Sequence, residues 1–147
     1  MATYTSSSWL AASAALVLIG LTFMTQNSHL ILCVDDELVG LKVRKILLER
    51  AGYRVLTAMD GPSGLSVFER EPIEAVVLDY SMPGMHGGEV AGRMRAIKPR
   101  VPILLLSAYI GLPAEVTSLV DLYMTKGEGA PMLLQKLESL LQPVSAP

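Results

Sequence analysis

Short apolar runs, each followed by a stretch with helical spacing, alternate along most of this 147-residue chain. Continuous runs of this kind, rich in Val, Leu and Ile, are typical of strands buried on both faces of a parallel sheet. The runs are Leu30–Val34, Ala75–Leu78, Val101–Leu106 and Leu122–Thr125, and Tyr53–Ala58 is predicted as a further strand. Five strand–helix units predict an α/β domain, a five-stranded parallel sheet wound with helices on both faces, over residues 29–141.

The segments between the runs have the features of helices. Asp60 is predicted to cap a helix that runs to about Arg70. A short helix is expected from about Pro113 to Leu119, and residues 142–147 form a tail. Glu37–Ala51 is predicted as a helix with an apolar face of Val39, Val43 and Ile46 and a polar face of Lys42, Lys45 and Glu49. The last helix begins at Pro131 and presents Leu133, Leu137, Leu140 and Leu141 on one face.

Residues 1–28 differ from the rest because they contain no charged side chain. Within them, Trp9–Met24 is apolar apart from Ser13 and Thr22, and it is shorter than the roughly 20 residues usual for a membrane span. Three interpretations remain open: a weak single membrane anchor at 9–24, a signal-like segment, or an upstream-start artefact or helix packed on the domain. The first would tether a cytoplasmic domain to the inner membrane.

Composition excludes several classes of site. The net charge of −2 shows no basic surplus, so bulk charge offers no case for nucleic-acid binding. Cys33 is the single cysteine, which excludes an internal disulfide and a cysteine zinc site. It lies inside an apolar run, and we expect an inert core thiol.

Polar side chains follow four of the apolar runs. Asp35, Asp36 and Glu37 come directly after the first strand. Like charges this close repel each other unless a cation lies among them, and Mg²⁺ prefers carboxylate and water oxygens. One acid would suffice to cap the next helix, whereas three favour metal binding by at least one of them.

Asp79, Ser107 and Lys126 end the later runs. The carboxyl ends of parallel strands line one crevice, so these side chains should meet the acids after the first strand. A carboxylate such as Asp79 can accept a phosphoryl group as an acyl phosphate. A hydroxyl at Ser107 and an ammonium at Lys126 can then bind the phosphoryl oxygens.

The ordered set resembles the receiver domain of bacterial response regulators over residues 29–141. The resemblance rests on Val34-Asp35-Asp36-Glu37, on Asp79-Tyr80-Ser81-Met82-Pro83-Gly84-Met85, on Leu106-Ser107-Ala108, and on Tyr123 three residues before Lys126. It implies a flavodoxin-like (βα)5 fold and a stand-alone module like that of chemotaxis regulators, which is a phosphoacceptor signalling domain and not a conventional enzyme.

The resemblance also implies roles for individual residues. Asp79 would be phosphorylated by a histidine kinase or phosphotransfer protein. Asp35, Asp36, Asp79 and the backbone carbonyl of Ser81 would hold Mg²⁺. Ser107 and Lys126 would bind the phosphoryl group, and Tyr123 would be the aromatic switch that changes contacts with an unidentified output protein.

Two departures from the family pattern stand out. The family lysine is usually followed by a cis-proline, whereas Gly127 follows Lys126 here, which predicts a looser loop into the last helix. The stretch from Ser107 to Lys126 is also short for the family, which predicts a reduced fourth helix. Since that face often carries output contacts, the output partner remains open, as does a homodimer through the face of the fifth strand.

Two other functions fit the residues less well. A Mg²⁺-dependent phosphohydrolase that forms an aspartyl-phosphate would use Asp35 and Glu37 and leave Asp79 unexplained. A receiver-like scaffold that works without phosphorylation would not need the intact acidic set.

Overall fold

The computed structural model describes residues 28–143. Its five strands form one all-parallel sheet in the order β2-β1-β3-β4-β5. The strands are β1 (Leu30–Val34), β2 (Arg54–Ala58), β3 (Ala75–Asp79), β4 (Ile103–Ser107) and β5 (Leu122–Thr125). This confirms the predicted fold class.

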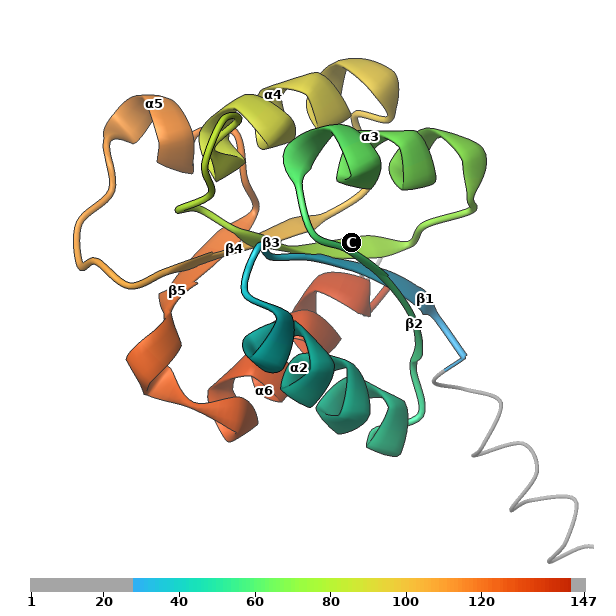
Figure 1. Cartoon of the computed structure of the whole chain (residues 1–147). Coiled ribbons are helices and arrows are strands. Elements are labelled where there is room, and N and C mark those ends of the chain that lie inside the picture. The colour runs from blue at the N-terminus through green and yellow to red at the C-terminus, as the bar shows by residue number, and fades with distance from the viewer. Residues whose placement is uncertain (1–27, 144–147) are drawn as a thin grey trace, which may run out of the picture.

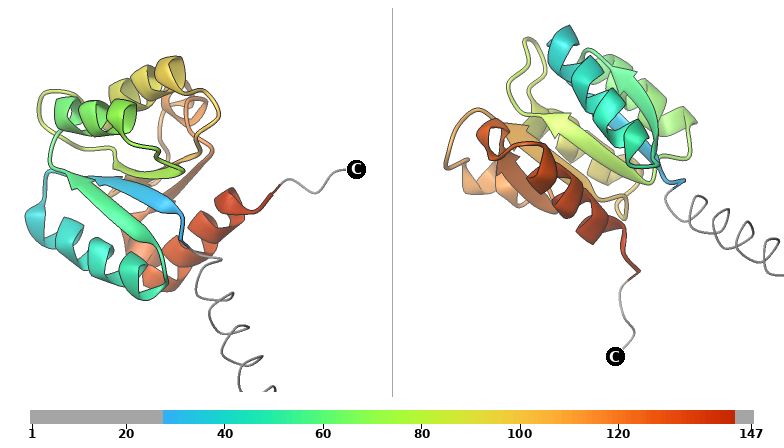
Figure 2. Two further views of the ribbon diagram at one scale, coloured as in Figure 1. Left: turned by 90° about the vertical axis from the view of Figure 1, so that its right-hand side faces the viewer. Right: turned by 90° about the horizontal axis from the view of Figure 1, so that it is seen from below.

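Helices cover both faces of the sheet. On one face lie α3 (Gly61–Arg70), α4 (Gly87–Ile97) and α5 (Ala114–Thr117), and on the other lie α2 (Leu38–Arg50) and α6 (Ala130–Leu141) (Figures 1 and 2). The 3-10 helix η1 (Lys126–Glu128) links β5 to α6. The order of the strands places β1 and β3 side by side although β2 separates them in the chain.

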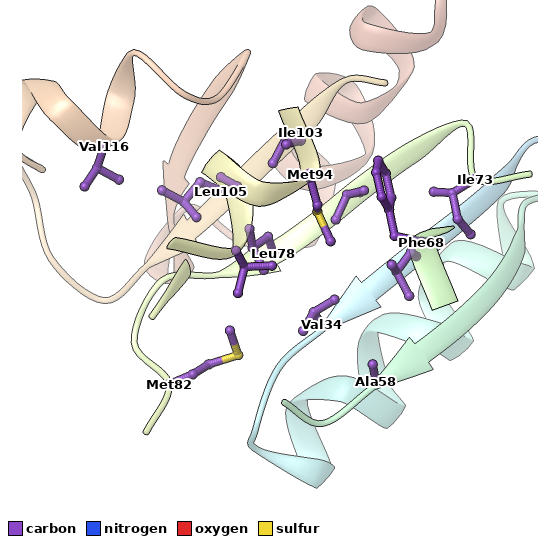
Figure 3. Packing of buried hydrophobic residues seen from close by; sticks show 14 of the residues in the cluster. Val34, Ala58, Phe68, Ile73, Leu78, Met82, Met94, Ile103, Leu105 and Val116 are labelled. Carbon is purple, nitrogen blue, oxygen red and sulfur yellow. The ribbon is translucent and has the colours of Figure 1, made fainter. Parts of the chain in front are cut away.

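Two apolar clusters, one on each face, hold the layers together. Every residue of β1, β3 and β4 is buried, so side chains that alternate along these strands feed both clusters. Phe68 and Met94 pack with Val34 and Leu78 on the α3 and α4 face (Figure 3). Burying a side chain of this size stabilises the fold by about 1.5–3 kcal/mol.

Cys33 lies in the cluster under α2 and α6 and is fully buried. Burial raises the pKa of its thiol to about 12. A thiol held neutral in this way is a poor nucleophile, which agrees with the predicted inert core role.

Side-chain caps fix where two of the helices begin. Asp60 Oδ1 accepts a 2.7 Å hydrogen bond from the backbone N–H of Ser63 at the start of α3, as predicted. His86 caps α4, because its Nδ1 accepts from the backbone N–H groups of Gly88 and Glu89. The acceptor role assigns the ring proton of neutral His86 to Nε2.

The orientation of α2 corrects the sequence analysis. Its predicted apolar face points away from the sheet, since Val39, Val43 and Ile46 are 68%, 60% and 51% exposed. Leu41 and Leu48 are buried instead. Apolar residues lie on more than one side of this helix, so the hydropathy pattern alone did not determine which side packs inward. The last helix behaves as predicted, with Leu133 and Leu137 buried.

The sequence predicts a reduced fourth helix and a looser loop after Lys126, and the structure bears on each in a different way. Helix α5 has four residues, which confirms the reduced fourth helix. The expectation of a loose loop after Lys126 is wrong, because Lys126–Glu128 forms a 3-10 turn with a capping box. Glu128 Oε2 accepts a 2.6 Å hydrogen bond from the backbone N–H of Thr125, and this contact holds the turn without a proline.

The predicted extension at residues 1–28, including the anchor at 9–24, lies almost wholly outside the described residues, as does the end of the tail. Among residues 28–143, no helix is long and apolar enough to cross a bilayer.

Candidate functional site

The adjacency of β1 and β3 brings their acidic ends together. Asp35 follows β1 and Asp79 is the last residue of β3, at the point where the strand order reverses. Ligands of open α/β sheets bind at such a switch point. Carboxylate oxygens of Asp35, Asp36 and Asp79 all lie within 4.8 Å of one another.

The three carboxylates differ in exposure. Asp35 and Asp79 are buried, with 0% and 2% of their surface exposed, whereas Asp36 is exposed. Two acids therefore form the floor of the site and the third forms its rim. A rim open to water gives an ion a route to the buried oxygens.

Lys126 completes the floor from the end of β5. Its Nζ lies 2.9 Å from Asp79 Oδ1 and 3.6 Å from Asp35 Oδ2. The contact with Asp79 is a close ion pair. Within the described part of the chain, no group other than Lys126 is paired with Asp79 Oδ1, so this buried oxygen retains capacity for a ligand.

Asp35 is held on both of its oxygens. Oδ1 accepts a 2.9 Å hydrogen bond from the backbone N–H of Glu37, and Oδ2 accepts a 2.7 Å bond from Nη2 of Arg44. Burial by itself would raise the pKa of Asp35, but these two bonds and the charges of Arg44 and Lys126 hold it below its usual value. Asp35 is therefore ionised at neutral pH.

The pKa of Asp79 is shifted in the opposite direction from that of Asp35. Burial raises the pKa of Asp79, the Lys126 ammonium opposes that rise, and the negative charges of Asp35 and Asp36 add to it. Burial would lower the pKa of Lys126, but the Asp79 and Asp35 carboxylates raise it, so Lys126 carries its charge. The acidic cluster is therefore not fully neutralised by the side chains around it.

Ser107 and Tyr123 lie on β4 and β5. Ser107 is buried, and its Oγ accepts a 2.9 Å hydrogen bond from the backbone N–H of Tyr109, which leaves its own proton free to donate. Tyr123 is 47% exposed and lines a cavity of about 450 Å³ together with Ile110. Ser81 is exposed, two residues beyond Asp79.

Sequence analysis missed two residues of this region. A Cβ on Gly87 would lie 2.4 Å from the backbone oxygen of Asp79, so only glycine allows α4 to begin this close to β3. Arg44 was not predicted, because the apolar pattern of α2 favoured the side that carries Val39 and Val43 as the inner face. Arg44 lies three residues after Leu41 and four residues before Leu48, and this spacing is the signal that could have placed it on the same buried face of α2.

The donor set fits a hard divalent cation. Three carboxylates converge, one of them is open to water, and in the described region the buried Asp79 Oδ1 is paired only with Lys126. Oxygen-only donors with space for water are what Mg²⁺ prefers.

Comparison with known families agrees with this geometry. Residues 31–138 match the family model of the response regulator receiver domain. The chain belongs to this family. Receivers are the signalling domains of two-component response regulators and are not enzymes in the usual sense.

Curated relatives of the chain are mostly transcriptional regulators. The alkaline phosphatase synthesis transcriptional regulatory protein PhoP of Bacillus subtilis is 40% identical over 65% of this chain and 41% of its own length. The transcriptional regulatory protein GlrR of Escherichia coli is 32% identical over 78% of this chain and 26% of its own length. The chain thus spans a quarter to a half of the length of such relatives.

Solved receiver structures match it over their full length. The response regulator protein TrrA of Thermotoga maritima, in complex with Mg²⁺ and BeF, is 36% identical with a TM-score of 0.73, over 77% of this chain and 99% of that one. The chemotaxis protein CheY4 of Vibrio cholerae is 27% identical with a TM-score of 0.73, over 78% and 99%. In another structure, TrrA is in complex with the histidine kinase ThkA.

Proposed function

We propose that this receiver accepts a phosphoryl group on Asp79, with Mg²⁺ held by Asp35, Asp36, Asp79 and the backbone carbonyl of Ser81, and that phosphorylation switches its protein–protein contacts. The observation that carries the proposal is the convergence of three carboxylates and Lys126 at the switch point of the sheet. A histidine kinase or phosphotransfer protein is the expected donor, as the complex of TrrA with ThkA suggests for a relative.

In the transfer, a carboxylate oxygen of Asp79 attacks phosphorus, the bond from phosphorus to the donor breaks, and the donor leaves with that electron pair. Charge builds up on the three phosphoryl oxygens during this step. A bound Mg²⁺ supplies charge neutralisation at those oxygens. Lys126 is already within 2.9 Å of the nucleophilic carboxylate and adds a fixed positive charge without rearrangement.

Asp79 suits the acceptor role better than Asp35 does. Both oxygens of Asp35 are engaged, by Glu37 and Arg44. In the described structure, Asp79 Oδ1 is paired with the Lys126 ammonium alone. This difference argues against the phosphohydrolase interpretation, in which the acid after the first strand is the nucleophile.

The switch is proposed to run from Ser107 to the surface. A phosphoryl oxygen on Asp79 would attract the free hydroxyl proton of Ser107. The Oγ of Ser107 is also bonded to the backbone of Tyr109, so its movement would draw the adjoining loop with it. The exposed Tyr123 and Ile110 share a cavity beside this loop, which gives the Tyr123 ring a place to turn into.

Intact-mass spectrometry tests the proposal. The full chain and its Asp79→Asn variant are incubated with acetyl phosphate and MgCl₂, and again with EDTA. We expect one added phosphoryl group in the parent with Mg²⁺ and none in the variant or with EDTA. No adduct on the folded parent would favour the phosphorylation-independent scaffold, and an adduct on the variant would move the nucleophile to Asp35 or Asp36.

A further inference from the structure

Helix α2 contains a glycine, Gly40, at a position where glycine does not stabilise the helix. Gly40 is the third residue of α2, and glycine stabilises a helix less than alanine does. A Cβ at this position would lie 3.3 Å from Nη2 of Arg44 and 3.2 Å from Oε2 of Glu37. The missing side chain therefore leaves room for the guanidinium of Arg44, one turn further along the helix.

Arg44 uses that room to reach the acidic site from its inner side. Its side chain is only 12% exposed, and its Nη2 donates to Asp35 Oδ2 at 2.7 Å. Asp35 Oδ1 is already taken by the Glu37 amide, and Lys126 lies 3.6 Å from Oδ2. The Asp35 carboxylate thus has its nearest donors in place before any metal ion binds.

The fit of Arg44 is incomplete in one respect. Its second terminal nitrogen, Nη1, is buried and has no hydrogen-bond partner among residues 28–143. An unsatisfied buried N–H group has an energetic cost. Arg44 is therefore held mainly by its single hydrogen bond to Asp35. A divalent cation that binds the Asp35 carboxylate more strongly can weaken this bond.

We propose that Arg44 is an internal counter-ion of Asp35 that competes with the divalent cation and so raises the Mg²⁺ concentration at which the site fills. The inference rests on the cation site proposed above and adds to it a residue outside the acidic set. Gly40 contributes to this arrangement, since its lack of a side chain makes space for the Arg44 guanidinium.

Arg44 could act on cation binding through its charge or by orienting Asp35, and the two roles predict opposite changes in cation affinity when Arg44 is removed. Asp35, Asp36 and Asp79 contribute −3, and Lys126 and Arg44 contribute +2, so removing Arg44 changes the sum from −1 to −2. A more negative site attracts a divalent cation more strongly. If Arg44 instead served mainly to orient Asp35, its removal would weaken binding.

Orientation is the smaller effect here. Asp35 is fully buried, and its Oδ1 remains fixed by the backbone N–H of Glu37, which no substitution at position 44 removes. Arg44→Leu should therefore leave Asp35 close to its present position while it removes the competing charge and the bond to Oδ2.

The test is cation binding by the full chain without any phosphoryl donor. Mg²⁺ affinity is measured by isothermal titration calorimetry, and Mn²⁺ affinity by electron paramagnetic resonance, for the parent, Arg44→Leu and Arg44→Lys. We expect the dissociation constant to fall about 10- to 100-fold in Arg44→Leu, as loss of a unit charge next to a ligand oxygen predicts. Arg44→Lys keeps the charge, so its constant should stay nearer that of the parent.

The other possible results of the binding experiment separate failure of the competition from failure of the cation site. An unchanged or higher dissociation constant in Arg44→Leu, with cation binding by the parent intact, overturns the competition and leaves the proposed function standing. An equal fall in both variants shows that charge is not the cause and also overturns it. Absence of cation binding in the parent and in both variants, with folding verified by circular dichroism, overturns the cation site itself and this inference with it.

Discussion

Replacing Asp79 by asparagine should stabilise the protein when divalent cations are absent. The substitution keeps the size and shape of the side chain and removes a buried negative charge. Carboxylate oxygens of Asp79 and Asp35 lie within 4.8 Å of each other, which at an effective dielectric constant of about 20 corresponds to a repulsion of ~3.5 kcal/mol before Arg44 and Lys126 offset the charge of Asp35.

The opposing attraction comes from Lys126. At 2.9 Å the same dielectric constant gives an upper limit of ~5.7 kcal/mol for its ion pair with Asp79. The actual value is well below this limit, because Lys126 is 35% exposed and is shared with Asp35. Burial of Asp79 and repulsion from Asp36 then make the charged form unfavourable, in agreement with the raised pKa of Asp79. We expect a net gain of about 1–2 kcal/mol in the free energy of unfolding for Asp79→Asn.

The difference in unfolding free energy between Asp79→Asn and the parent should become smaller as pH falls. Because the folded pKa of Asp79 is above its ordinary value of 3.8, the folded parent binds the extra proton first as pH falls. The parent therefore recovers stability between the raised pKa and 3.8, and its deficit relative to Asp79→Asn closes in that window. Asp35 has a lowered pKa, so the stability that it contributes is lost only at still lower pH, in both proteins.

Urea denaturation in EDTA, followed by circular dichroism, measures the difference at pH 7 and across the acidic range. Asp121→Asn is the control, because Asp121 accepts from the backbone N–H of Ile103 at 2.8 Å and pairs with Arg95 away from the site. It should be neutral or destabilising. A stability of Asp79→Asn equal to or below that of the parent at neutral pH would refute the electrostatic account. Adding Mg²⁺ should stabilise the parent more than the variant and so narrow the difference.

Two further predictions concern packing, and both are measured by urea denaturation. Gly87→Ala should lower the free energy of unfolding by about 2–3 kcal/mol, since its Cβ would lie 2.4 Å from the Asp79 backbone oxygen. Gly92→Ala, in the same helix with 3.8 Å of clearance, should instead add about 0.5–1 kcal/mol, and equal effects would contradict the close approach. Leu137→Ala should cost about 2–5 kcal/mol because the side chain is fully buried. Val43→Ala should change stability by less than about 0.5 kcal/mol, and a large loss would show that the outer face of α2 is covered.

Much of the fold and of the candidate site could be predicted because the relevant signals are local. Continuous apolar runs between helical segments imply a parallel sheet, and in such a sheet the residues after each strand share one edge. Asp35, Asp79 and Lys126 lie at that edge for this reason, and the structure brings their charged groups within 4.8 Å or less of their neighbours. The turn that begins at Lys126 also depends on a local signal, because Thr125 and Glu128 have the spacing of a capping box.

Contacts between distant segments had to come from the tertiary structure. Apolar residues on several sides of α2 leave its inward face undetermined, and only packing against the sheet turns Leu41 and Leu48 inward and leaves Val39 exposed. The same rotation carries Arg44 to Asp35. By itself, then, the sequence determined the order of the elements and the chemistry at the strand ends, because both depend on neighbours in the chain. The rotation of α2, and with it the counter-ion of Asp35, depended on how the layers pack.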